Sequence, residues 1–357
     1  IEVAHGGGGK SGFGSYAGDT IYTGTVTLTE TGVFPGTVPV HVESGTMTLG
    51  TAGTPATLAN NRTPDAIYNK GGAGELILAN VNHAAGSNTN YTWVLRQGTL
   101  TTTQDPAVVG TSGGQLASGF LNLDNVLYTS GSIWPTWKIT TNDQTYSTNG
   151  ASGHFGFNNL DVEAGRTLTL NMGNGILGAG DGTTLWLLHK QGAGTWVYTT
   201  NNTGGGYGAN GFIQVDEGTL DIRGGGSMGG GVSLRLSGGE LDVSGAGNRF
   251  SASSIFEIDA DGGRLGLSPA ATADVSRAGV ITWTQGLPPV SFAARDNYNL
   301  GFTNTDFPDV NAGTTLLIER HGTGTGEVRI YDTAVAVNGT IGGSGRLQMG
   351  SAATGTL

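Results

Sequence analysis

The feature that most constrains this chain is an internal repeat. The 31 residues 70–100 align without a gap with residues 190–220, and ten of the aligned positions are identical. Each copy reads as a Lys/Gly turn, a short strand, a polar loop, a second strand and a closing Gly-Thr-Leu, so that Lys70 matches Lys190. Such a repeat indicates stacked units, because each unit buries its apolar face only against its neighbours.

A shorter pattern recurs along the rest of the chain. An apolar position, two polar or Gly residues and a Gly turn lead into an alternating strand, as in VESGTMTLG at 42–50, VDEGTLDIR at 215–223 and LSGGELDVS at 236–244. Turn spacings of about 20–25 residues match one coil of a solenoid. Alternation of Val, Leu and Ile with Thr, Ser and Asp indicates an inward and an outward strand face. We therefore predict an all-β fold, a single-stranded parallel β-helix (β-solenoid) of roughly 13–17 coils with protruding loops.

Composition decides between this fold and disorder. The chain has 66 glycines without a Gly-X-Y period, which excludes collagen. Its hydrophobic residues make up 36% of the chain and fall into alternating runs, which favours strands over a disordered Gly-rich chain. The net charge of −11 argues against sequence-independent binding to nucleic-acid phosphates.

Cysteine usage and hydropathy bear on location. The chain has no cysteine, so an exported form would depend on hydrogen bonding and stacking for its stability. It has no apolar run of 18 residues, so we expect no transmembrane helix. It begins at Ile1 without a signal peptide, and we expect a processed, mature chain at the cell surface or outside the cell.

The domain organisation is predicted to be simple. Residues 1–20 form an N-terminal strand followed by a Gly-rich tether, and residues 21–357 form the β-helix. Proline, aromatic and Asn/Ser-rich stretches near 104–158 and 268–309 predict irregular or loop-bearing segments, because proline is confined to corners and edges of sheets. No linker divides the chain.

The first four residues are a candidate assembly element. Ile1 and Val3 alternate with Glu2 and Ala4, and the glycines 6–9 that follow impose almost no conformation. The segment is either a frayed terminus or a strand that pairs with a neighbouring molecule. The repeat also resumes at the C-terminal end without a polar cap, and open coils offer backbone groups to other chains. We expect a homo-oligomer or polymer through open β-helix ends.

Three segments resemble a known family. GAGELIL at 72–78, GAGTWVY at 192–198 and GTGEVRI at 324–330, with the polar loop NNTGG at 201–205, are similar to the autotransporter-associated β-strand repeat. The resemblance implies a right-handed parallel β-helix that is exported and displayed at the cell surface. It implies a scaffold and no enzyme activity.

The chain lacks the common motifs of catalysis and metal binding. The six histidines are dispersed, and Asp259-Ala260-Asp261-Gly262 lacks the further ligands of a calcium loop. No lipase-type nucleophile elbow and no phosphate-binding loop occur. We expect no catalytic residue, no metal site and no cofactor.

Two alternatives to a purely structural role remain open. Trp134, Trp137 and Tyr146 could form an exposed aromatic platform for surface glycans, since sugars stack on aromatic rings, or they could plug an irregular core. Acidic pairs such as Asp161 with Glu163, and Glu240 with Asp242, could serve a polysaccharide-degrading enzyme, although such pairs are common on solvated strands.

The expected function is that of a non-catalytic extracellular structural protein. It would be a rigid β-helix subunit that assembles end to end into a surface fibre, filament or layer. The alternatives are a surface adhesin that binds glycans and a polysaccharide-degrading β-helix enzyme.

Overall fold

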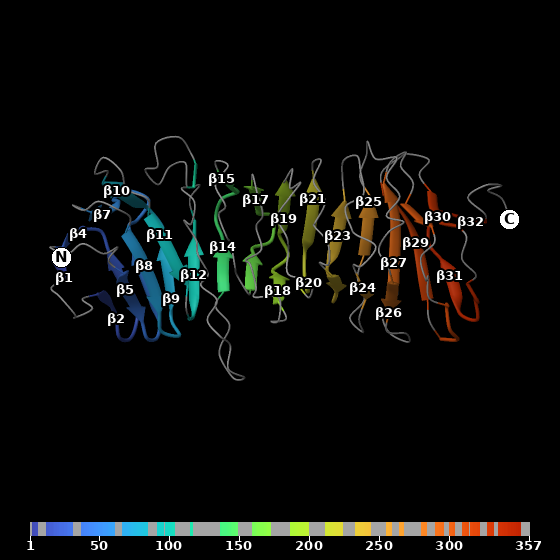
Figure 1. Ribbon diagram of the computed structural model, residues 1–357, viewed down its shortest axis with the longest axis horizontal. Coiled ribbons are helices and arrows are strands. Elements are labelled where there is room, and N and C mark those ends of the chain that lie inside the picture. Colours follow the sequence, from blue (N-terminus) through green and yellow to red (C-terminus); the bar gives the residue numbers. More distant parts are fainter. Residues whose placement is uncertain are drawn as a thin grey trace. The chain divides into compact units, whose positions relative to one another are not determined.

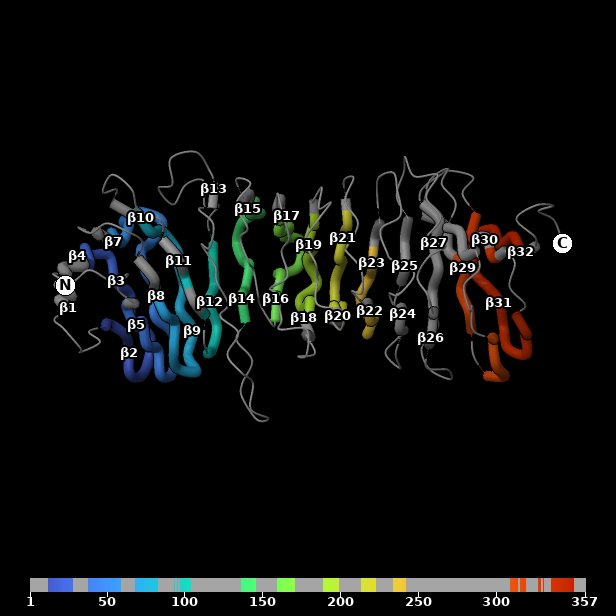
Figure 2. The backbone as a smooth tube through the Cα atoms, in the orientation of Figure 1, coloured from blue at the N-terminus to red at the C-terminus, as the bar shows by residue number. Residues whose placement is uncertain are grey.

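A computed structural model describes most of the strand-forming parts of the chain (Figures 1 and 2). The described residues are 2–5, 12–30, 37–60, 66–84, 91–95, 97–103, 115–116, 136–148, 159–172, 186–199, 211–223, 233–243, 255–258, 264–267, 280–283, 290–295, 300–303, 309–313, 315–321, 327–331 and 335–350. They contain strands and turns and no helix. The chain divides into two compact units, Ile1–Gly178 and Ala179–Leu357, which are considered separately.

The first unit is built from parallel strands that return to the same sheets coil after coil. One sheet has the order β1-β4-β7-β10, with strands Glu2–His5, Thr25–Glu30, Ala56–Asn60 and Val81–Ala84. A second has the order β11-β8-β5-β2, with strands Tyr91–Leu95, Ala66–Gly71, Thr37–Val42 and Phe13–Ser15. A third runs β16-β14-β12-β9-β6-β3, with strands Asn159–Val162, Thr136–Ile139, Thr99–Thr102, Glu75–Leu78, Thr46–Leu49 and Thr20–Tyr22. Strands β13 (Gln115–Leu116), β15 (Gln144–Thr148) and β17 (Thr167–Met172) pair beside them in that order.

This order is that of a β-solenoid. The successive triplets β1-β2-β3, β4-β5-β6, β7-β8-β9 and β10-β11-β12 each place one strand in each of three sheets. The third sheet advances by one coil at each step, so this unit makes about five turns. In Figure 1 its strands, blue to green, lie side by side as parallel ladders.

The core of the first unit consists of apolar rows that cross the coils. The register places Leu76, Leu100, Trp137 and Leu160 opposite one another on β9, β12, β14 and β16, and each is at most 1% exposed. Full burial of such a side chain contributes about 1.5–3 kcal/mol. Side chains alternate between the two faces of a strand, so every second residue points inward. The stacked coils align these inward residues into continuous apolar rows.

The second unit repeats the design. One sheet has the order β26-β24-β22-β20-β18, with strands Val280–Trp283, Ile255–Ile258, Ser233–Leu236, Gly211–Val215 and Trp186–Gln191. Another has the order β19-β21-β23-β25-β27-β29-β31, with strands Thr195–Thr199, Thr219–Arg223, Glu240–Val243, Arg264–Leu267, Val290–Arg295, Thr315–His321 and Thr340–Gly342. Strands β28 (Leu300–Thr303), β30 (Glu327–Tyr331) and β32 (Arg346–Gly350) form the last. Trp196, Leu220 and Leu241 stack in register and are buried.

Glycines turn the corners between strands. Gly45, Gly72, Gly98, Gly192 and Gly218 all have φ between 66° and 79°, the left-handed region that side chains with a Cβ avoid. Corner aspartates also accept a hydrogen bond from an amide of the next coil, as Asp19 does from Thr46 at 3.1 Å and Asp143 from Thr167 at 2.8 Å. The glycine-rich composition is therefore a requirement of the corners.

The predicted fold class, an all-β parallel β-solenoid, is confirmed. The total number of coils and the handedness pass through residues outside the described set and stay predictions. Within the segments expected to be irregular, β14 and β15 near 104–158 and β26, β27 and β28 near 268–309 are regular parallel strands. No helix in the described residues could span a membrane.

Candidate functional site: an open coil edge and two lysine corners

The first coil of the first unit has an open side in all three of its sheets. Among the described residues, β1, β2 and β3 are each the outermost strand of their sheet, and they lie next to β4, β5 and β6. A strand with a neighbour on one side only offers its other edge to a further strand. The first coil is therefore a candidate surface for strand addition.

The predicted assembly residues lie on this coil. Glu2, Val3 and Ala4 belong to β1 and pair in parallel with Thr27, Leu28 and Thr29 of β4. Ile1 and the side chains of β1 lie outside the described residues. In this structure the strand is a member of the chain's own sheet, so a neighbouring molecule would meet its outer edge.

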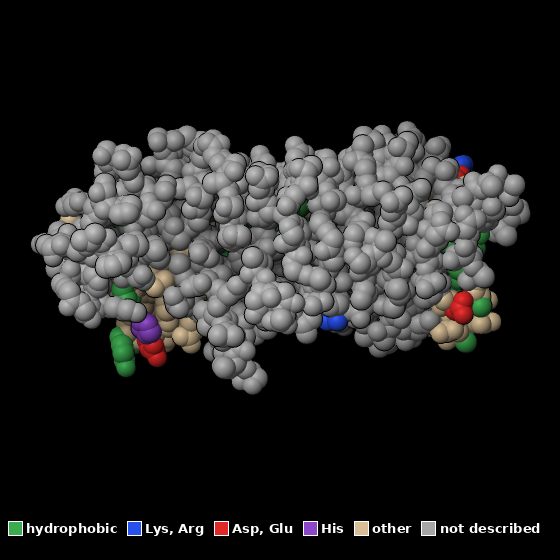
Figure 3. Space-filling model, viewed as in Figure 1, with side chains coloured by type: hydrophobic (Ala, Val, Ile, Leu, Met, Phe, Trp, Pro, Cys, Tyr) green, Lys and Arg blue, Asp and Glu red, His purple; other side chains and the backbone are tan. Residues whose placement is uncertain are grey.

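Large apolar side chains are exposed at terminal strands. Among the described residues, the exposed large hydrophobic side chains are those of Tyr16, Ile21, Val337 and Ile341. Ile21, on the outermost strand β3, is 65% exposed, and Tyr16, directly after β2, is 84% exposed. Ile341 belongs to β31, which is also outermost in its sheet. Figure 3 shows hydrophobic side chains (green) at the surface of each unit.

A second feature of the molecule is a buried lysine at matching corners of the repeat. Lys70, at the end of β8, is fully buried and donates hydrogen bonds to the carbonyl oxygens of Gly71 (3.0 Å), Gly72 (2.8 Å) and Gln97 (3.0 Å). The first two acceptors belong to its own turn and the third to the corner of the following coil. The ammonium group therefore ties two successive coils.

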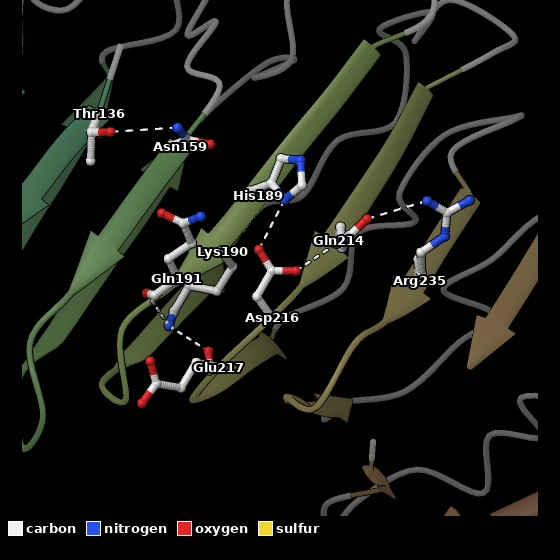
Figure 4. A network of polar contacts seen from close by, with 9 residues as sticks. All are labelled: Thr136, Asn159, His189, Lys190, Gln191, Gln214, Asp216, Glu217 and Arg235. Atoms are coloured by element: carbon white, nitrogen blue, oxygen red, sulfur yellow. Dashed lines mark hydrogen bonds and ion pairs between the residues drawn. The ribbon is translucent and has the colours of Figure 1, made fainter. Parts of the chain in front are cut away.

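The second copy has the same arrangement. Lys190, at the end of β18, is fully buried and donates to the carbonyl oxygens of Gln191 (2.9 Å), Gly192 (2.6 Å) and Glu217 (3.0 Å). Figure 4 shows the ammonium group between the Gln191 and Glu217 carbonyls. The identity of lysine in the two aligned segments thus reflects one shared corner geometry.

The electrostatics of the corner set the protonation of the lysine. Burial lowers the pKa of Lys70 from its usual 10.5 to about 8, and the Glu75 carboxylate acts in the opposite direction. The Glu75 side chain also accepts a hydrogen bond from the Thr101 hydroxyl of the next coil. Main-chain carbonyls, and not a directly bonded carboxylate, are the hydrogen-bond acceptors of this charge.

A polar network lies next to the Lys190 corner. The Nδ1 atom of His189 lies 2.9 Å from Oδ2 of Asp216, and Gln214 donates to the other carboxylate oxygen at 2.6 Å (Figure 4). Arg235 donates to Oε1 of Gln214 at 3.3 Å. The residues come from β18, β20, β22 and the corner after β20, so the network links three coils. His189 and Asp216 are partly exposed, and each side chain already contacts a neighbour, as expected of a tie between coils.

Of the candidate glycan platform, the structure describes the side chain of Trp137. Trp137 is 0% exposed, lies in the core row between Leu100 and Leu160, and donates from Nε1 to Oγ1 of Thr102 at 3.0 Å. Its ring cannot stack on a sugar at the surface, because it alternates inward on β14. Of the two possibilities for Trp137, an exposed platform or a side chain that fills the core, the buried position is the one observed. Trp134 and the side chain of Tyr146 lie outside the described residues, although the Tyr146 backbone pairs with buried Leu170.

The acidic pairs considered for catalysis have structural neighbours. Glu163 is exposed and accepts a hydrogen bond through Oε2 from the Thr141 amide of the preceding corner at 3.2 Å. Asp161 pairs in register with Lys138 on β14. The side chain of Asp242 and the 259–262 turn lie outside the described residues. Within the described part of the chain, no group of three or more His, Asp or Glu side chains could hold a metal ion.

The lysine corners do not belong to any of the motifs that the sequence presents as candidate functional sites. The signal was present, because Lys70 stands two residues after Tyr68 and so in phase with an inward apolar position. Register with Val40 and Leu95 places it inside the core. A lysine at an inward-facing strand position that recurs in an aligned repeat is therefore the sequence signal for such a corner.

Comparisons with the known protein families, with curated proteins and with solved structures give no match for this chain. The class that the observations define is that of a parallel β-solenoid with internal lysine corners. The resemblance to the autotransporter-associated repeat therefore remains an expectation.

Proposed function

We propose that this protein is a non-catalytic structural β-solenoid that assembles end to end with further copies of itself. The observation that carries the proposal is the exposure of Tyr16 and Ile21 on the first coil, whose three strands are all outermost in their sheets. Exposed apolar side chains beside an open strand edge favour addition of another strand, because both backbone groups and apolar surface become buried.

The other end of the proposed contact is formed by the last strands of the second unit. Ile341 on β31 and nearby Val337 are exposed in the same way. A contact between two different surfaces of the same chain is head to tail, and such contacts continue into filaments when they do not close into a ring. This supports a fibre, filament or layer over a closed dimer.

We also propose an extracellular location and a relationship to the passenger-type repeats that the sequence resembles. The support is the Gly-rich repeat without cysteine together with a parallel solenoid. An exported scaffold would obtain rigidity from the corner ties described above. The burial of Trp137 removes the main residue on which a glycan-binding alternative rested.

Sedimentation velocity over a range of concentrations tests the assembly. We expect the unmodified chain to form larger species as concentration rises, and Ile21→Asp to remain monomeric, because a charge would be buried at the contact. Thr145→Asp is the matched control, since Thr145 is exposed on β15, which has neighbours on both sides. A monomeric unmodified chain at every concentration, or assembly of Ile21→Asp equal to that of Thr145→Asp, would overturn the proposal.

A further inference from the structure

At two corners of the molecule, main-chain carbonyl oxygens accept hydrogen bonds from a buried lysine ammonium group. At each corner a lysine ammonium donates to three main-chain carbonyls at 2.6–3.0 Å. An ammonium group has three hydrogens, so its donors match the acceptors at the corner. Two acceptors come from the lysine's own turn and one from the next coil, in both copies.

The corner geometry is fixed by backbone and not by the lysine. Gly98 turns with φ of 72° and Gly218 with φ of 66°, and these two residues follow the acceptors Gln97 and Glu217. A Cβ on Gly98 would overlap the carbonyl oxygens of Gly72 and Gly74, and one on Gly218 would overlap those of Gly192 and Gly194. The glycines therefore permit several carbonyls to converge on one point.

The interior on either side of the charge is apolar. Lys70 stands in register between Val40 and Leu95, and Lys190 pairs with Val215, all of which are buried. Converging carbonyl oxygens are a known way for proteins to bind potassium and other hard cations, because they replace the hydration shell of the ion. Potassium and ammonium ions are close to each other in size.

We propose that each corner is a monovalent-cation site whose resident cation is the lysine's own ammonium group, and that a free ammonium or potassium ion occupies it when the side chain is shortened. This explains why lysine stands at a position that other coils fill with valine or leucine. The methylene stem of the lysine fills the apolar row, and the head group supplies the charge.

The test uses Lys190→Ala in the full chain, refolded and melted in choline, sodium, potassium or ammonium chloride at equal ionic strength. We expect its Tm in choline to lie below that of the unmodified chain. Potassium or ammonium should raise it in a saturable manner by about 2–4 °C or more, since a ligand that binds only the folded state raises stability. Lys70→Ala provides the same test in the first unit.

Two controls separate a cation site from a general salt effect. Lys190→Met fills the space with apolar atoms. Its Tm should therefore lie below that of the unmodified chain, as for Lys190→Ala, but should not rise in potassium or ammonium chloride. Lys138→Ala, at a half-buried outward position on β14, should follow the unmodified chain in every salt. Equal salt responses in Lys190→Ala and Lys190→Met, or a Lys190→Ala chain that stays unfolded in every salt, would overturn the proposal.

Discussion

At Gly98 the chain turns with φ of 72°, and a side chain added there would begin 2.8 Å from the Lys70 ammonium. The residue therefore has two constraints, backbone conformation and space. Gly165 has the same φ of 72° but nothing within 4 Å of an added Cβ. Gly165 is therefore constrained by backbone conformation alone, whereas Gly98 is constrained by both conformation and packing.

Replacing Gly98 by alanine should lower the free energy of unfolding by about 3–5 kcal/mol, because the new methyl would overlap the Gly74 carbonyl and the Gly72 carbonyl that accepts from Lys70. Gly165→Ala should cost only about 1–2 kcal/mol, the price of the left-handed conformation. Urea unfolding followed by circular dichroism measures both. Equal losses in the two variants would show that space at Gly98 does not matter.

Replacing Lys70 by methionine should lower the free energy of unfolding by about 2–4 kcal/mol at pH 7, because one buried and two part-buried carbonyls lose their donor. The matched surface change, Lys138→Met, should cost less than about 0.5 kcal/mol. Chemical unfolding of the two variants in parallel decides the point. If Lys70→Met were as stable as Lys138→Met, the corner tie would contribute nothing.

The stability contribution of Lys70 should also depend on pH in a defined direction. Its pKa is lowered to about 8 in the folded chain and is 10.5 when unperturbed, so between these values the unfolded chain binds more protons. Stability then rises with pH through this window. Relative to Lys70→Met, the unmodified chain should gain on the order of 2 kcal/mol between pH 7 and pH 10. A difference between the two chains that is flat or falls over this range would contradict the assignment.

Among the strands, β12 and β14 share a polar tie inside the apolar core. Thr102 on β12 accepts from Nε1 of Trp137 at 3.0 Å and donates to Oε1 of Gln144 at 2.8 Å, and Gln144 donates to the Thr102 carbonyl at 2.6 Å. All three side chains are buried. The tie connects β12, β14 and β15 across two coils.

Thr102→Val keeps the shape of the side chain and removes its hydroxyl, so the Trp137 and Gln144 groups would remain buried without it. We expect a loss of about 1–3 kcal/mol in the free energy of unfolding. Thr48→Val, at an outward position on β6, should change it by less than about 0.5 kcal/mol. A thermal or urea titration compares the two, and a Thr102→Val chain as stable as Thr48→Val would show that the tie is not stabilising.

Alternation of polar and apolar residues is a good strand signal, but its surroundings can hide it. The run Thr136–Ile139 alternates in this way, yet it follows Pro135 in an aromatic stretch that predicts an irregular, loop-bearing segment. Its place as β14 follows from pairing with β12 and β16, which lie 37 and 23 residues away. Such register depends on neighbouring coils, so the local pattern alone could not show that Trp137 stacks between Leu100 and Leu160 in the core row.

The same limit applies to the lysine corners. The identity of Lys70 and Lys190 in the repeat was visible, but the third acceptor of each ammonium lies 27 residues further along the chain. Only stacking of one coil on the next brings Gln97 or Glu217 to the lysine. The repeat predicts that positions 70 and 190 are equivalent. Only the stacking of the coils shows that each lysine ties one coil to the next.

For the whole molecule, the central claim is that its parallel solenoid assembles through open coil edges. Each unit has its own buried rows and its own lysine corner, and the exposed apolar side chains described lie on or beside terminal strands. Stacking of further coils would bury the strand edge and these side chains together.

Negative-stain imaging of the purified chain at increasing concentration tests this claim most directly. We expect end-to-end rods or filaments that lengthen with concentration in the unmodified chain and in Thr145→Asp, and single particles in Ile21→Asp. Single particles of uniform size from the unmodified chain at the highest concentration would contradict it.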